Sequence, residues 1–310
     1  MSDGIKKSLI RTLTHNAVES AWIQWAALGA RITTPRPAQS MVDPEALVLI
    51  SMALRDHERR LWEVLASWAE RWSTALSVQR IKNLRESYPE PIGPRVAELA
   101  WIAFEEGGDH RWRNLAGKGA GPRRRGQDLA RPVSKGWDPA ALVVRLRLGI
   151  GVGLQADVLA FLLAQQEHWV SARDIVDATG YTVYAIRRTA DKMAEARLIE
   201  STAGKPVKYR ADRSVWSGVL GSRAPVVPWR HWHQVYALVA GLVSLVEGWE
   251  PNAPTPYLQS TRLRDFTENH LDAFRLSRLS PPEAGLQPRE YLNAFASSIE
   301  ALGEWIQAEA

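Results

Sequence analysis

The sequence predicts a mainly α-helical protein in which a central helix-turn-helix with a small β-hairpin wing lies between two α-helical domains. Along both flanks, apolar residues recur at the three- and four-residue spacing of helices. Near the middle of the chain, residues 199–210 show the pattern of a short hairpin. A stretch rich in Gly, Pro and Arg, residues 117–137, precedes the central unit and is typical of a linker or long loop.

These patterns divide the chain into four predicted segments. They are an N-terminal helical domain at residues 1–116, a basic linker at 117–137, a helix-turn-helix with its wing at 138–215, and a C-terminal helical domain at 216–310.

Composition narrows the class of protein. Of the 310 residues, 45% are hydrophobic, which is enough to build sizeable cores. The absence of cysteine excludes disulfide bonds, thiolate catalysis and Cys-based zinc sites. The first residues lack the apolar core of a signal peptide, and the longest apolar run, residues 235–246, is too short for a membrane span. We therefore expect a soluble, cytoplasmic protein with no membrane association.

The positive charge of the chain is concentrated in two stretches. The formal net charge is +5. Residues 182–210 contain seven basic and three acidic side chains, and residues 117–136 contain six basic and one acidic. Together these stretches exceed the surplus of the whole chain, so the remainder is slightly acidic. Such clustering favours a polyanionic partner.

The flanks consist of amphipathic helices. Asp43-Pro44 is a good helix start, because Asp can cap a helix and Pro suits its first turn. Helical stripes follow at residues 61–72 and, in the C-terminal flank, after Pro228 and from about Pro288. The 14 tryptophans are spread along the chain, and we expect most of them to anchor helix cores.

The central unit carries the local signals of two helices joined by a tight turn. Ser171 and Asp174 have the spacing of a capping box at the start of the first helix. Gly180 permits the left-handed backbone of the turn, and Thr182 can cap the second helix. On the second helix the residues expected to face the core are Val183, Ile186, Ala190 and Met193. Leu198-Ile199 then closes the core, and Val207 and Tyr209 are expected to face inward from the hairpin.

The opposite face of the second helix is cationic and aromatic. Tyr184, Arg187 and Arg188 lie near its N-terminal half, where such side chains can contact base edges or phosphates. Lys205 and Lys208 lie at the tip and side of the hairpin and can add affinity for the DNA backbone. The predicted DNA-binding residues are Arg173, Thr182, Tyr184, Arg187, Arg188, Lys192, Lys205 and Lys208. Arg123, Arg124 and Arg125 in the linker are candidates for a second arm on the DNA backbone; the alternative is a solvated tether.

The run from Ile175 to Arg210 resembles the winged-helix core of the ArsR/MarR-like bacterial transcription regulators. The pattern includes Ala178-Thr179-Gly180-Tyr181-Thr182, then Ile186-Arg187-Arg188, and Leu198-Ile199. The resemblance covers roughly residues 154–213 and departs at Arg197, where Gly is common. No Cys metal-sensing motif is present, so metal sensing is not implied.

We therefore expect a sequence-specific regulator that binds double-stranded DNA as a homodimer on a palindromic operator. Dimerisation is expected from symmetry and from the apolar helices on both flanks. No cofactor is expected, and the helical domains are expected to mediate dimerisation or to bind a small-molecule or protein effector. Two alternatives remain open. One is a protein-interaction module, such as an antitoxin or assembly component, and the other is a non-specific nucleic-acid-binding protein of a defence or repair system.

Other motifs give weaker signals. Residues 149–156 contain a G-x-G-x-x-A pattern, but two short helices and a hairpin follow it instead of the parallel-sheet unit that dinucleotide binding needs. His231 and His233 are two residues apart on a helix and are poor joint metal ligands, whereas His270 suits a core or interface position. No nucleophile elbow, P-loop or His-Glu-x-x-His motif occurs, so we do not expect an enzyme.

Overall fold

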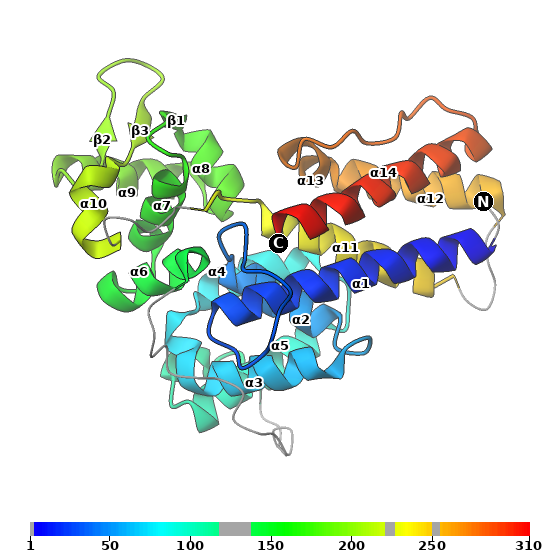
Figure 1. The fold of residues 1–310 in the computed structure, drawn as a ribbon, viewed down its shortest axis with the longest axis horizontal. Helices are drawn as coiled ribbons and strands as arrows, with labels where there is room; N and C mark the ends of the chain where they lie inside the picture. Colours follow the sequence, from blue (N-terminus) through cyan, green and yellow to red (C-terminus); the bar gives the residue numbers. More distant parts are fainter. Residues whose placement is uncertain (1–2, 118–137, 221–226, 250–254) are drawn as a thin grey trace.

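The computed structural model describes residues 3–117, 138–220, 227–249 and 255–310. Figure 1 shows a winged helix-turn-helix at one end of the molecule, drawn in green, and a body of packed helices beside it. We call residues 138–220 the winged-helix unit, and the other described residues the helical body. The mainly α fold with a central winged helix-turn-helix is confirmed.

The first part of the helical body is a set of helices joined by short turns. Its α-helices are α1 (Asp3–Ala27), α2 (Pro44–Ala53), α3 (Arg59–Trp72), α4 (Val78–Leu84) and α5 (Ile92–Trp101). Its shorter turns are η1 (Ser73–Ala75), η2 (Arg85–Ser87), the π-helical η3 (Ile102–Glu106) and η4 (His110–Trp112). As predicted, Asp43 caps α2, its carboxylate accepting a hydrogen bond from the Ala46 amide at 3.1 Å.

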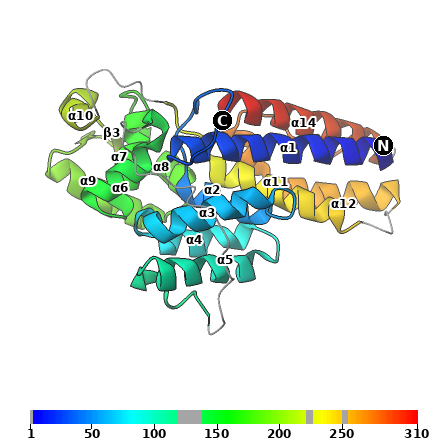
Figure 2. The ribbon, with the colours of Figure 1, turned by 60° about the horizontal axis from the view of Figure 1, so that its bottom comes forward.

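The second part of the helical body consists of the C-terminal helices and packs against the first part. It contains α11 (Trp232–Glu247), α12 (Pro256–Asn269), α13 (Leu271–Leu276) and α14 (Pro288–Glu309). Figure 2 shows α1 alongside α14, with α11 beneath them. Tyr236 of α11 ties the two parts together, because its hydroxyl lies 2.6 Å from Ser20 Oγ and accepts from Gln24 Nε2 at 2.8 Å.

The two helical flanks share one hydrophobic core, although the sequence predicts a separate helical domain on each side of the centre. The reason is α11, which is apolar on most of its surface and therefore must be covered on several sides. It packs against α1 and α2 from the first flank and α13 from the second. Large aromatic side chains fill this core as expected, and Trp25, Trp68, Trp112 and Trp232 are almost fully buried.

The winged-helix unit has its own core. Its elements are η5 (Pro139–Ala141), α6 (Leu142–Ile150), α7 (Leu154–Ala164), β1 (Val170–Ser171), α8 (Ala172–Thr179), α9 (Val183–Glu195), β2 (Glu200–Ser201), β3 (Lys208–Arg210) and α10 (Arg213–Leu220). The three strands form an antiparallel sheet in the order β1-β3-β2, with Val170 opposite Tyr209 and Glu200 opposite Arg210. Gly149 lies within α6, and Gly151, at a φ of 97°, and Gly153 form the joint to α7, so these glycines do not open a parallel βαβ unit.

Candidate nucleic-acid interface

The first helix of the helix-turn-helix, α8, begins with the predicted capping box. Ser171 Oγ accepts from the Asp174 amide at 3.3 Å, and the Asp174 carboxylate accepts from the Ser171 amide at 2.8 Å. The helix ends at Gly180, whose φ of 73° lies in the left-handed region. A side chain here would be strained, so glycine fixes the turn that aims the second helix.

The second helix, α9, is capped by Thr182, whose Oγ1 accepts from the Ala185 amide at 3.3 Å. Ile186, Ala190 and Met193 are buried against the core of the unit. Val183, also expected in the core, is only half-buried. Because one face of α9 is held inward by these residues, the opposite face is presented to solvent.

The outer face of α9 carries exposed cations that form no ion pair with another described residue. Tyr184 is 73% exposed, and the Arg188 guanidinium lies 5.8 Å from the centre of its ring. Arg187, Arg188 and Lys192 are exposed, and none forms an ion pair with another described residue. Asp177 pairs with two other arginines, and Asp191 accepts from Tyr209 of the wing, while Glu195 of α9 is exposed and forms no ion pair with another described residue.

Arg173 differs from the other predicted cations. It is exposed on α8, but its Nε lies 3.0 Å from Asp177 Oδ1 one turn along the same helix. Arg173 therefore shares this carboxylate with Arg275. The structure brings Thr182, Tyr184, Arg187, Arg188 and Lys192 onto one helix, and places Arg173 on the neighbouring one.

The wing is attached to α9 through a part-buried hydrogen bond. The hydroxyl of Tyr209 on β3 donates to Asp191 Oδ1 at 2.7 Å, and burial together with this carboxylate raises the pKa of Tyr209 to about 12. Lys205 and Lys208 are exposed on the same hairpin, as predicted. The sequence places Tyr209 inward correctly, but Val207, which lies just before β3, is 37% exposed. Leu198, in the turn after α9, is 43% exposed.

Arg210, which the sequence does not single out, strengthens the base of the wing. Its Nε lies 2.7 Å from Glu200 Oε2 across the strand pair. Its guanidinium lies 4.7 Å from the centre of the Trp169 ring. The Trp216 indole N–H also donates to the Leu198 carbonyl at 3.0 Å, which attaches α10 to the end of α9.

A buried cluster of charges joins the winged-helix unit to the helical body. Arg147 and Asp157 come from α6 and α7, whereas Asp43, Glu45 and Arg80 come from the start of α2 and from α4. All five side chains are more than nine-tenths buried. Sequence periodicity does not predict this cluster; the available signal is that Arg147 and Asp157 interrupt otherwise apolar helix faces.

Two arginines connect the carboxylates of this cluster. Arg147 bridges the two parts, with Nη1 at 2.5 Å from Glu45 Oε1 and Nε at 2.7 Å from Asp157 Oδ1. Arg80 Nη1 lies 2.5 Å from Asp43 Oδ1 and 2.6 Å from Glu45 Oε2. Burial opposes the charge of each arginine, but the surrounding carboxylates raise both pKa values above the ordinary range of arginine.

The same cluster fixes the turn between α8 and α9. Arg80 Nε donates to the carbonyl of Thr179 at 2.8 Å, and the Tyr181 hydroxyl donates to Asp157 Oδ2 at 2.9 Å. These residues flank Gly180 on both sides. The direction of α9 is therefore set by contacts to the helical body as well as by its own core.

The remaining candidate residues do not join this surface. Arg123, Arg124 and Arg125 lie outside the described residues. His231 Nδ1 donates to the Asp177 carbonyl, His233 is buried near Asp43, and His270 packs against the Phe266 ring. Within the described ranges, no group of three His, Asp or Glu side chains is arranged to hold a metal ion.

The antiparallel three-stranded sheet, the glycine turn and the exposed cationic helix define a winged helix-turn-helix of the kind found in DNA-binding proteins. Residues 149–206 match the family model of the MarR family, which confirms the resemblance found in the sequence and makes this segment a MarR-like winged helix. A MarR family domain indicates a DNA-binding transcription regulator. Searches of the curated proteins and of the solved structures gave no match. Among the described helices, none combines the length and the apolar character needed to cross a bilayer.

Proposed function

We propose that the protein is a sequence-specific transcription regulator that inserts α9 into the DNA major groove. The observation that supports this most directly is the set of exposed cations on the outer face of α9 that form no ion pair with another described residue. Arg187 and Arg188 can donate to guanine edges or phosphates, and Tyr184 extends the same surface. Lys205 and Lys208 on the wing contact the flanking phosphates, where they add affinity without sequence preference.

We further propose that two copies act together on a palindromic site. The described residues of the chain form one winged helix. One winged helix covers one half-site. A two-fold dimer presents two α9 helices to successive major grooves, about 34–36 Å apart. The helical body supplies the dimer contacts.

The experiment is selection of bound sequences from a random DNA pool, followed by gel-shift titration of the enriched site. The wild-type protein is expected to enrich a motif with two related half-sites. Replacing Arg187→Ala together with Arg188→Ala is expected to weaken binding to that site by 100-fold or more, because one good base contact contributes about 1–3 kcal/mol.

Arg289→Ala provides the matched control. Arg289 is an exposed arginine at the start of α14 and is not part of the proposed surface. This variant is expected to bind like the wild type. Recovery of no motif by the wild-type protein would make operator regulation wrong and would favour the non-specific alternative.

A further inference from the structure

A groove runs between α1 and α14 in the helical body, where the two helices lie side by side (Figure 1, Figure 2). Two cavities of about 460 Å³ and 350 Å³ lie along it, and they share the lining residues Asn16 and Gln307. We call the two cavities together the α1–α14 groove. All the residues that line it belong to the helical body, so the groove is separate from α9 and the wing.

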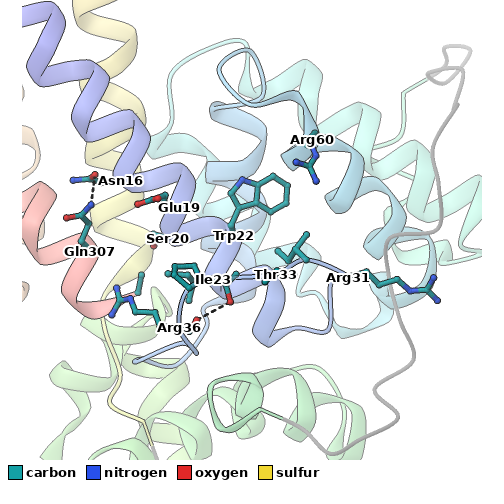
Figure 3. Close-up of a pocket in the computed structure, with 14 residues that line it drawn as sticks. Asn16, Glu19, Ser20, Trp22, Ile23, Arg31, Thr33, Arg36, Arg60 and Gln307 are labelled. Carbon is teal, nitrogen blue, oxygen red and sulfur yellow. Dashed lines mark hydrogen bonds between the residues drawn. The ribbon is translucent and has the colours of Figure 1, made fainter.

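The centre of the α1–α14 groove is fixed by side-chain amides. Gln307 Nε2 donates to Asn16 Oδ1 at 3.0 Å, as Figure 3 shows, and Asn16 Nδ2 donates to the Gly303 carbonyl at 3.1 Å. Gly303 allows the helices this close approach, because a Cβ there would lie only 3.0 Å from Asn16 Nδ2. The groove is therefore formed before a partner arrives, which lowers the entropic cost of binding.

The larger cavity forms the cationic end of the groove. Its lining includes the arginines Arg31, Arg36 and Arg60. None of these arginines forms an ion pair with another described residue. The acidic side chain on the same lining is Glu19, which lies 3.5 Å from His15 Nε2. The arginines remain in excess even when an α-carboxylate at Ala310, which also lines this cavity, is counted.

Apolar side chains form the floor of the cationic end. Trp22 and Ile32 are half-buried, and Ile23 is 4% exposed. The Arg60 guanidinium lies 5.5 Å from the centre of the Trp22 ring. Figure 3 shows Arg60 and Arg36 on different sides of Trp22. Tryptophan and arginine are among the residue types that most often dominate binding between proteins, so this end suits an apolar side chain with a carboxylate beside it.

The backbone of residues 31–36 offers further donors at this end. The segment lies outside helices and strands, and Arg36 Nη1 attaches it to α14 by donating to the Ala308 carbonyl at 3.2 Å. The amides of Thr33, Thr34 and Arg36 form no hydrogen bond with another described residue. Backbone amides of this kind can pair with the carbonyls of a bound peptide.

The smaller cavity forms the acidic end of the groove. Glu300 and Glu304 of α14 line it together with Ser8 and Thr12 of α1, and no cation lies on this lining among the described residues. Both glutamates are exposed, and neither forms an ion pair with another described residue. The groove therefore changes sign along its length. A nucleic acid is negative throughout and does not match this pattern, whereas a peptide can match it.

We propose that the α1–α14 groove binds a peptide segment of a partner protein. At the cationic end an apolar side chain packs against Trp22, and a neighbouring carboxylate accepts from Arg36 and Arg60. At the acidic end a basic side chain pairs with Glu300 and Glu304. The lining residues of α1 run from Ser8 to Ile23, which is about 22 Å of helix or about seven residues of extended peptide. This contact does not depend on the proposed function.

The test is selection of peptides from a displayed library of random dodecapeptides on the full-length protein. Peptides that also bind the Arg36→Gln, Arg60→Gln double variant are removed. The enriched peptides are expected to carry an acidic residue beside an aromatic or large aliphatic one, and a basic residue further along. Fluorescence polarisation of a labelled enriched peptide measures affinity. The Arg36→Gln, Arg60→Gln variant is expected to weaken it tenfold or more, and Glu300→Gln with Glu304→Gln threefold or more.

Charge reversal separates a docking role from a structural one. Arg36→Glu with Arg60→Glu is expected to lose the enriched peptide and to bind its counterpart in which lysine replaces the acidic residues. A merely structural role would not produce this exchange of partners. Arg11→Gln with Arg59→Gln is the matched control, because both arginines are exposed on α1 and α3 outside the groove. This variant is expected to keep the wild-type affinity.

Three results would overturn the proposal. They are an enrichment that does not depend on Arg36 and Arg60, enriched peptides without acidic residues, and self-association in sedimentation velocity that the same variants abolish. The last result would show that a second copy of the chain occupies the groove. Peptide binding by a protein that shows no DNA preference would leave the groove standing and reject only the proposed function.

Discussion

Arg197 is the residue at which the chain departs from the family pattern, and the structure gives the departure a physical meaning. Its φ of 58° lies in the left-handed region just after α9. A side chain in this conformation costs about 1–2 kcal/mol, which is why glycine is common at such a position. The departure leaves the fold intact, because the surrounding core and the sheet hold the backbone in this turn.

Replacing Arg197→Gly is therefore expected to stabilise the protein by about 0.5–1 kcal/mol, since glycine relieves the strain but also loosens the unfolded chain. The measurement is denaturant unfolding followed by circular dichroism. Lys192→Gly, in the helical part of α9, is the matched comparison and is expected to destabilise by a similar amount. A loss of stability in Arg197→Gly would show that its side chain contributes more than its backbone costs.

Among the elements, α8, α9 and the glycine turn follow from the sequence because their signals are local. The Ser171–Asp174 capping box, Gly180 and the Thr182 cap each act within three or four residues. The position of the wing is harder to predict from the sequence. It depends on the hydrogen bond between Tyr209 and Asp191 of α9, which spacing along the chain does not reveal. The inward placement of Val207 fails because this residue lies before β3 begins.

The wing makes a prediction at this scale. Tyr209→Phe removes the hydroxyl while keeping the ring, and it leaves the Asp191 carboxylate without its partner. Stability is expected to fall by about 1–2 kcal/mol. The wing lysines lose their fixed relation to α9, so affinity for DNA of any sequence is expected to fall several-fold while preference among sequences persists. Gel shifts on an enriched and a scrambled site measure this, and a selective loss on the enriched site would contradict it.

At the scale of the whole molecule, the sequence predicts the flanking helices and the winged helix-turn-helix but not how they pack against one another. Helical periodicity identifies each flanking helix, yet it does not show that α1 and α14 lie side by side around α11. The buried charged cluster is also hidden from the sequence, because Arg80, Asp43 and Glu45 contact the winged-helix unit from positions distant in sequence. Such buried ion clusters stabilise little overall, but removing one member leaves uncompensated charge and costs about 3–5 kcal/mol.

The junction also makes stability depend on pH. Burial lowers the pKa of His233 to about 3, against the weaker opposing effect of Asp43. The unfolded chain takes up a proton near pH 6.5, while the folded chain keeps His233 neutral. Stability is therefore fully present above about pH 6.5 and is lost as the pH falls toward 3, at up to about 1.4 kcal/mol per pH unit.

Unfolding titrations between pH 7 and 4.5 measure this slope. His233→Gln is expected to reduce it, whatever its effect on stability at pH 7, and His231 and His270, whose pKa values burial also lowers, account for the slope that remains. His15→Gln, an exposed histidine on α1, is the control and is expected to keep the wild-type slope. An unchanged slope in His233→Gln would place the pH dependence elsewhere.

We propose that α9 distinguishes DNA sequences while the wing contributes only general affinity. The most direct measurement is the ratio of affinities for an enriched site and its scrambled version, titrated at several salt concentrations. Arg187→Ala with Arg188→Ala is expected to bring this ratio close to one. Lys205→Ala with Lys208→Ala is expected to weaken both sites equally and to reduce the salt dependence. A double α9 variant that keeps the wild-type ratio would contradict the account.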